Sequence, residues 1–119
     1  MDYAHDSQLL KGVLTLVLLK LLAERESYGY ELATRVHELG LTGVADGSIY
    51  PALSRLERDG HVVSRLVPSQ QGPARKYYRL SERGAAALAE RQAAWNSLVG
   101  MLAPLLKRPL RTSPKEAAP

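Results

Sequence analysis

The segment 46–60 combines hydroxyl, aromatic and guanidinium side chains at helical spacing, and such groups can recognise a DNA duplex. With 3.6 residues per turn, Ile49, Leu53 and Leu56 form one apolar stripe. The rest of the helix surface carries side chains that can approach base edges and phosphates, namely Ser48, Tyr50, Pro51, Ser54, Arg55 and Arg58. The pattern indicates a recognition helix, and an ordinary solvated surface helix is the alternative.

Other kinds of site chemistry find little support in the sequence. It contains no cysteine, so it has neither a disulfide framework nor a thiolate metal site. His5, His37 and His61 have no partner at helical spacing, and Asp2 and Asp6 beside the first of them are interpreted as solvated. The sequence also lacks a nucleophile–base set and a phosphate-binding glycine loop. We therefore expect no metal, no cofactor and no enzymatic activity.

Length and charge fit a single basic domain. The chain has 119 residues and a net charge of +4. Segment 1–60 carries six Lys/Arg and nine Asp/Glu, whereas segment 61–83 carries five Lys/Arg and one glutamate. Positive charge gathered in one part of the chain predicts a polyanionic partner. The polar, acidic N-terminus and the short, interrupted apolar run at 13–22 predict a cytoplasmic protein without a membrane segment.

Two helices are expected ahead of segment 46–60. Residues Leu9–Ala23 are apolar almost all round, which predicts burial on several sides. In a small domain, a partner chain is the economical way to cover the remaining apolar surface. Residues Tyr28–Leu39 carry an inner apolar stripe, with Ser27 as the expected N-terminal cap and Gly40 as the stop.

The second of these helices and segment 46–60 together predict a helix-turn-helix arrangement. They are joined by a short connector that contains Gly43, and the second helix carries the polar outer face. Asp46 or Ser48 can cap this helix at its start. Gly60 stands where a left-handed residue would end it.

A β-hairpin is expected directly behind the recognition helix. Residues 61–67 and 75–80 indicate two strands, and residues 68–74 form a turn rich in proline and glycine. Alternation places Tyr78 with Lys76 and Leu80 on one face and Arg75, Tyr77 and Arg79 on the other. Tyr78 is therefore expected in the core. The basic flank suits a contact with the DNA backbone or minor groove.

The C-terminal part predicts one long helix, capped by Ser81 and running from Glu82 to about Ala103, where Pro104 should end or kink it. Its broad apolar face is typical of a dimerisation helix. The fold class is thus mainly α with a small β-hairpin, a winged helix-turn-helix plus a dimerisation helix. The expected divisions are a DNA-binding domain at 1–81, a dimerisation helix at 82–106 and a disordered basic tail at 107–119.

The sequence resembles the PadR family of winged-helix transcriptional regulators. The resemblance rests on residues 10–12, 28–32 (YGYEL), 47–57 (GSIYPALSRLE) and 72–84 (GPARKYYRLSERG), in one register from about Leu9 to Gly84. The single helix that follows is similar to the short subgroup of that family. Ala45 departs from the family pattern, in which a helix-capping hydroxyl often stands, so the start of the recognition helix stays open.

The resemblance implies a homodimeric DNA-binding regulator, usually a repressor and often relieved by a small molecule. Carried over by position, Tyr30 would meet a phosphate and Ser48, Tyr50 and Ser54 would face the groove. The resemblance also implies that Arg75 and Lys76 serve the wing. Pro51 and Arg55 complete the expected DNA-binding set on the recognition helix.

Three of these side chains have ordinary structural alternatives. Tyr50 could pack on the domain surface instead of entering the groove. Arg55 and Arg58 could pair with Glu57 or Asp59, although exposed pairs of this kind are weak and would yield to phosphate.

Trp95 is the one tryptophan, and it lies on the expected dimerisation helix. It could simply anchor the interface between two chains. Because some members of the similar family respond to flat aromatic compounds, the alternative is that Trp95, with Val99, lines an effector cavity.

These expectations combine into one mechanism. Two chains pair through the first and last helices and set two recognition helices about one DNA turn apart, roughly 34 Å, on a pseudo-palindrome. An effector at the dimer core would change that spacing and lower DNA affinity. The alternative function is a winged-helix protein–protein interaction module without its own operator.

Overall fold

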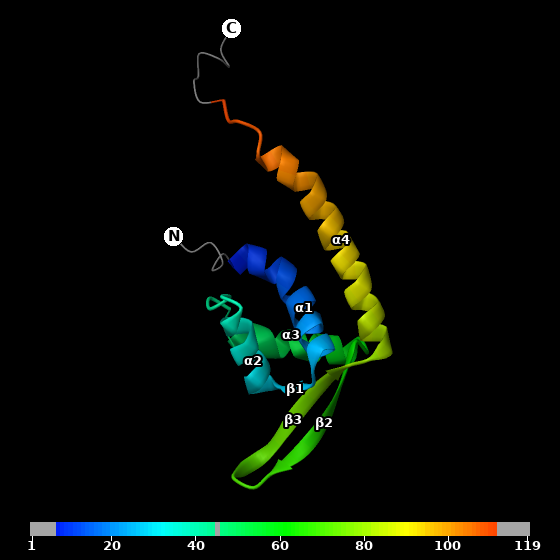
Figure 1. Ribbon diagram of the computed structural model, residues 1–119. Helices are drawn as coiled ribbons and strands as arrows, with labels where there is room; N and C mark the ends of the chain where they lie inside the picture. The colour runs from blue at the N-terminus through cyan, green and yellow to red at the C-terminus, as the bar shows by residue number, and fades with distance from the viewer. Residues whose placement is uncertain (1–6, 45, 112–119) are drawn as a thin grey trace.

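The computed structural model describes residues 7–44 and 46–111 and forms a winged helix-turn-helix with one long C-terminal helix (Figure 1). In chain order the elements are α1 (Ser7–Glu24), β1 (Ser27–Tyr28), α2 (Gly29–Glu38), α3 (Asp46–Arg58), β2 (Val62–Ser69), β3 (Gly72–Leu80) and α4 (Glu82–Leu106). The mainly helical fold class with a small β-hairpin is confirmed. The N-terminal histidine and carboxylates and Ala45 lie outside the described residues.

One hydrophobic core joins the first three helices to the sheet. Leu18 and Leu19 of α1, Leu32 of α2, and Ile49 and Leu53 of α3 are all fully buried in it. The apolar stripe predicted for the recognition helix is therefore the side that packs inward. Because that side is fixed in the core, the polar side of α3 must face outward.

The sheet is antiparallel with strand order β1-β3-β2, and the hairpin β2–β3 projects from the helices as the wing (Figure 1). The pairing runs from Val62 opposite Leu80 to Val67 opposite Arg75, with an irregularity between Val67 and Ser69. The strands extend beyond the predicted ones, and the predicted turn at 68–74 is too long. The turn is tight because the chain reverses between Ser69 and Gly72.

The predicted capping role of Ser27 is wrong. Ser27 lies in β1, a strand that sequence reasoning did not identify, and pairs with Tyr78 of β3. Its hydroxyl accepts a hydrogen bond from Nη1 of Arg35 at 2.8 Å, and Nη2 of the same buried arginine donates to the Leu21 carbonyl at 3.0 Å. The N-cap of α2 is Tyr28, without a side-chain cap bond. Arg35 thus ties α2 both to the end of α1 and to β1.

Glycine and serine set the helix ends largely as predicted. Gly40 and Gly60 adopt φ values of 101° and 78°, the left-handed geometry that favours glycine at a helix stop. Ser81 caps α4, because its Oγ accepts from the Gly84 backbone N–H at 2.9 Å. Pro104 does not end α4, which continues to Leu106. Proline has no backbone N–H, so Pro104 costs the helix one hydrogen bond. The last turn still forms, because the Lys107 N–H donates to the Ala103 carbonyl at 3.2 Å.

The helix α4 extends away from the winged domain and packs against α1 and β3 (Figure 1). Its apolar side chains remain exposed in the single chain, with Trp95 at 43% and Met101 at 66%. The apolar side of α4 thus stays largely uncovered in the single chain. None of the described helices is both long and apolar enough to cross a bilayer. Residues 112–119 of the predicted disordered tail lie outside the described residues.

A test of the junction between the wing and α4 uses Gly84. A Cβ there would collide with the His61 carbonyl oxygen, which is backbone and cannot move aside cheaply. We expect Gly84→Ala to lower the free energy of unfolding by about 2–4 kcal/mol through overpacking and strain. Chemical denaturation of the variant and of the unmodified protein measures this difference in the free energy of unfolding.

The matched variant is Gly47→Ala in α3, where a Cβ meets nothing within 4 Å. It should be neutral or stabilising by about 0.5–1 kcal/mol, because alanine favours the helix. Equal stability of Gly84→Ala and the unmodified protein would contradict the close packing.

Candidate nucleic-acid interface

The outer face of α3 carries the side chains that the sequence predicted for DNA recognition. Ser48, Tyr50, Pro51, Ser54 and Arg55 are all exposed. They share this face because the opposite side of the helix is held in the core. The alternative pairing is observed for Arg58, whose Nε lies 3.7 Å from Oδ1 of Asp59 in an exposed contact. Such a pair is weak in water.

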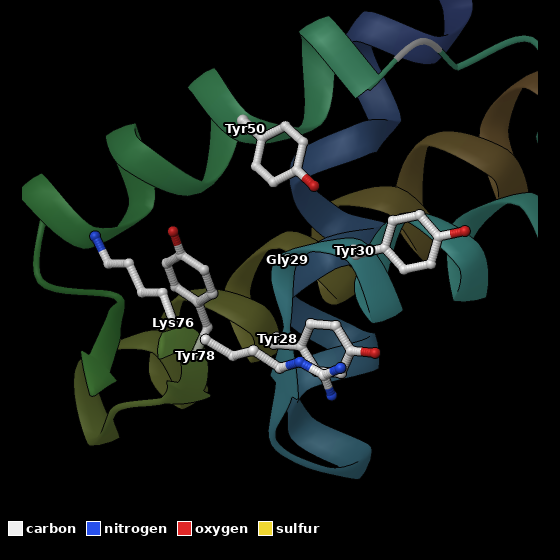
Figure 2. Close-up of a pocket in the computed structure, with 7 residues that line it drawn as sticks. Tyr28, Gly29, Tyr30, Tyr50, Lys76 and Tyr78 are labelled. Atoms are coloured by element: carbon white, nitrogen blue, oxygen red, sulfur yellow. The ribbon is translucent and has the colours of Figure 1, made fainter. Parts of the chain in front are cut away.

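A shallow hollow of about 320 Å³ lies beside α3, between the start of α2 and strand β3. Figure 2 shows Tyr50 reaching from α3 toward Gly29 and Tyr30 of α2, with Lys76 and Tyr78 contributed by the wing. The hollow is lined by Tyr28, Gly29, Tyr30, Tyr50, Arg75, Lys76 and Tyr78. Four predicted residues, Tyr30, Tyr50, Arg75 and Lys76, therefore meet at one place. Ser48, Pro51, Ser54 and Arg55 do not line this hollow.

Contacts between aromatic rings and arginine side chains join the wing to the start of α2. The guanidinium carbon of Arg75 lies 4.6 Å from the centre of the Tyr28 ring. The Tyr28 and Tyr77 ring centres are 5.3 Å apart, and the guanidinium carbon of Arg65 lies 5.7 Å from the Tyr77 ring centre. Cation–π contacts hold an arginine in place without neutralising it. Arg75 is thus an exposed, oriented positive charge at the edge of the hollow.

Lys76 differs from Arg75, because its ammonium group is paired with a carboxylate. Nζ of Lys76 donates to Oε1 of Glu57 at 3.0 Å, and the hydroxyl of Ser64 donates to the other oxygen of the same carboxylate. These two hydrogen bonds hold the pKa of Glu57 below its usual value, and the bond from Ser64 has the larger effect. The hydrogen bond that Lys76 donates to Glu57 in turn raises the pKa of Lys76. Glu57 therefore links α3 to both strands of the wing.

A second carboxylate fixes the wing to the turn after α1. Arg65 donates from Nη2 and Nε to the two oxygens of Glu26, at 2.6 and 3.1 Å, in a bidentate pair. This hydrogen bonding lowers the pKa of Glu26 and raises that of Arg65. Sequence reasoning missed Glu26, and it considered Glu57 as a partner of Arg55 or Arg58 and not of Lys76 and Ser64. The sequence did hold a signal for Glu57. It is a glutamate near the end of the predicted recognition helix, and a predicted strand of the hairpin carries a lysine.

The predicted effector residues lie on α4, apart from this hollow. Trp95 lines a separate hollow of about 210 Å³ between α1 and α4, together with Gly12, Leu16, Arg91, Ala94 and Leu98. Val99 is exposed on α4 but is not part of that lining. Within residues 7–44 and 46–111, no group of His, Cys, Asp or Glu side chains is arranged to hold a metal ion.

Comparison with known proteins gives a consistent family. Residues 18–90 match the transcriptional regulator PadR-like family. The crystal structure of a PadR-like transcriptional regulator from Bacillus cereus is 37% identical, with 86% of this chain and 99% of that chain covered and a TM-score of 0.77. A Streptococcus transcriptional regulator is 34% identical, with 84% and 98% covered and a TM-score of 0.76. Rv3488, a transcriptional regulator of Mycobacterium tuberculosis, is 40% identical over 78 residues, which are 64% of this chain and 69% of that protein.

The charge of Glu57 can be tested through the pH dependence of stability. The pKa of Glu57 in the folded protein lies below the ordinary glutamate value of 4.5, so the carboxylate contributes stability above that pH. The contribution is lost as the pH falls through the folded pKa. We expect Glu57→Gln to be less stable than the unmodified protein at pH 7, by about 1 kcal/mol or less for a pair this exposed. The difference should shrink on acidification.

Urea unfolding at one fixed protein concentration, from pH 7 to below the ordinary pKa of a glutamate, gives both curves. Glu90→Gln, an exposed position on α4, is the matched control. If the free energies of unfolding of Glu57→Gln and of the unmodified protein change in parallel across this pH range, the negative charge of Glu57 contributes nothing to stability.

Proposed function

Because this chain belongs to the PadR-like family of transcriptional regulators, we propose that it is a homodimeric repressor that binds a pseudo-palindromic DNA operator. Membership of the family makes it a DNA-binding transcriptional regulator and not an enzyme. The observation that carries the finer proposal is the exposed polar face of α3 beside the hollow that gathers Tyr30, Tyr50 and Arg75. The protein would act in the cytoplasm.

The proposed DNA contacts divide by chemistry. Ser48, Tyr50 and Ser54 would read base edges, with Pro51 and Arg55 beside them, because their side chains lie on the outer face of α3. Tyr30 and Arg75 would meet phosphates, since a hydroxyl and an oriented guanidinium suit an anion. Lys76 would join them by exchanging Glu57 for a phosphate, a step that an exposed ion pair allows at little cost.

The proposed dimer is formed by α1 and α4. The exposed apolar side chains of α4 support it, because a solvated stripe of tryptophan, leucine and methionine is costly for a monomer. The divisions proposed are residues 1–81 for DNA binding, 82–106 for dimerisation and 107–119 as a basic tail. An effector, proposed to be a flat aromatic molecule, would lie near Trp95 and Val99 and relieve repression by changing the spacing of the two α3 helices.

Selection of bound fragments from genomic DNA identifies the operator, and its absence would favour the protein-interaction alternative. On that operator, we expect Arg75→Ala and Lys76→Ala each to weaken binding and to reduce the salt slope by about 1, as the loss of one phosphate contact does. The larger loss is expected for Arg75→Ala, because Lys76 must first leave Glu57. Fluorescence anisotropy at several salt concentrations measures both quantities.

Lys107→Ala at the end of α4 is the control for the removal of one positive charge away from the wing. If neither wing variant changes affinity or salt slope, the assignment of the wing to phosphate contact is wrong.

Trp95 offers a combined test of the dimer and of the effector hollow. Planar dyes should quench its fluorescence in the dimer, and the signal is unambiguous because the chain has one tryptophan. Met101→Asp places a charge on the exposed apolar face of α4 and should yield a monomer in sedimentation and weaken the quenching. If no planar dye quenches the fluorescence of Trp95 in the intact dimer, the effector proposal is wrong. If the unmodified protein sediments as a monomer, the proposed dimer is wrong.

A further inference from the structure

The start of α2 and the ring of Tyr50 are in unusually close contact. A Cβ built on Gly29, which is buried, would lie 2.6 Å from Cε1 and 3.4 Å from Cδ1 of Tyr50. Real Cβ atoms essentially never come within 3.0 Å of another heavy atom in this way. Figure 2 shows the Tyr50 ring turned toward Gly29 across the hollow. The ring therefore occupies space that exists because residue 29 has no side chain.

The backbone gives no other reason for a glycine at this position. Gly29 does not share the positive φ values of Gly40 and Gly60, and it is the first residue of α2. Alanine is better than glycine in a helix, because it loses less backbone freedom on folding. The favourable feature of glycine here is the room that it leaves for the neighbouring ring.

We propose that Gly29 is a positioning residue for DNA recognition, which sets where the Tyr50 ring lies on the recognition helix. The inference rests on the proposed function, in which Tyr50 faces the groove. Tyr50 is 42% exposed, so one part of the ring lies against Gly29 while another part reaches the surface that a duplex would meet. A glycine in the first helix of the motif thereby orients a side chain of the second.

A methyl group at this position has a defined consequence. Ordinary contact needs about 3.5–4.0 Å, so the ring would move outward by roughly an ångström or more. The move is open to it, because the ring is the far end of an exposed side chain and not backbone. The fold is therefore retained, and the ring no longer lies where it would read a base. Misplacement of one base-reading side chain is enough to cost about tenfold in affinity.

The test is a double-mutant cycle on the operator with the full chain. We expect Gly29→Ala to weaken binding about tenfold, comparable to the loss of one specific base contact. In a Tyr50→Ala background, Gly29→Ala should have no further effect, because the ring that it displaces is gone. In a Tyr50→Phe background its full cost should remain, because the contact is made by ring carbons and not by the hydroxyl.

The readouts separate positioning from stability. Thermal unfolding of Gly29→Ala should be unchanged or raised; if it is lowered, the loss must vanish in the Tyr50→Ala background. The same cost of Gly29→Ala with and without the Tyr50 ring would overturn the inference, as would wild-type affinity of Gly29→Ala when Tyr50→Ala binds weakly. Wild-type affinity of Tyr50→Ala would overturn the proposed role of Tyr50 itself, and the positioning role with it.

Discussion

Burial of one side of α3 is the constraint on which the rest of the structure depends. Ile49 and Leu53 are fully buried, and this fixes the rotation of the helix about its axis. Side chains on the opposite face, such as Tyr50 and Ser54, are then exposed. A free energy that comes from apolar burial thus determines the position of the polar groups that would meet DNA.

Acidic residues stabilise the wing of a protein that is basic overall. Glu57 connects α3 to Ser64 and Lys76, and Glu26 holds Arg65 in a bidentate pair. These carboxylates stand near cations that a phosphate would also attract, so they limit how freely the wing can move while leaving its charge exchangeable. Arg75, which stacks on Tyr28, has the opposite character, because its position is fixed and its charge is left uncompensated by that contact.

The features that the sequence predicted correctly are those that depend on residues close together in the chain. The stripes of 46–60, the stops at Gly40 and Gly60, the cap at Ser81 and the burial of Tyr78 depend on a few neighbours in sequence, and the structure has all of them. Ser27 was misplaced because a two-residue strand is defined by its partner on β3, about fifty positions away. The roles of Glu26 and Gly29 were missed for the same reason. The pair formed with Arg65 and the contact with Tyr50 each join distant segments.

The recognition helix and α4 are connected through one serine. Oγ of Ser81 donates to the carbonyl of Gly60, which ends the turn after α3, at 2.6 Å, and also accepts the N–H of Gly84 in the first turn of α4. The backbone N–H of Ser81 donates to the His61 carbonyl at 3.1 Å, the same oxygen against which Gly84 packs. The end of α3 and the start of α4 are thus joined by hydrogen bonds and by close packing with no space for a side chain between them. Because packed junctions of this kind shift as units, a change in the direction of α4 would be passed to α3 rather than absorbed in a loop.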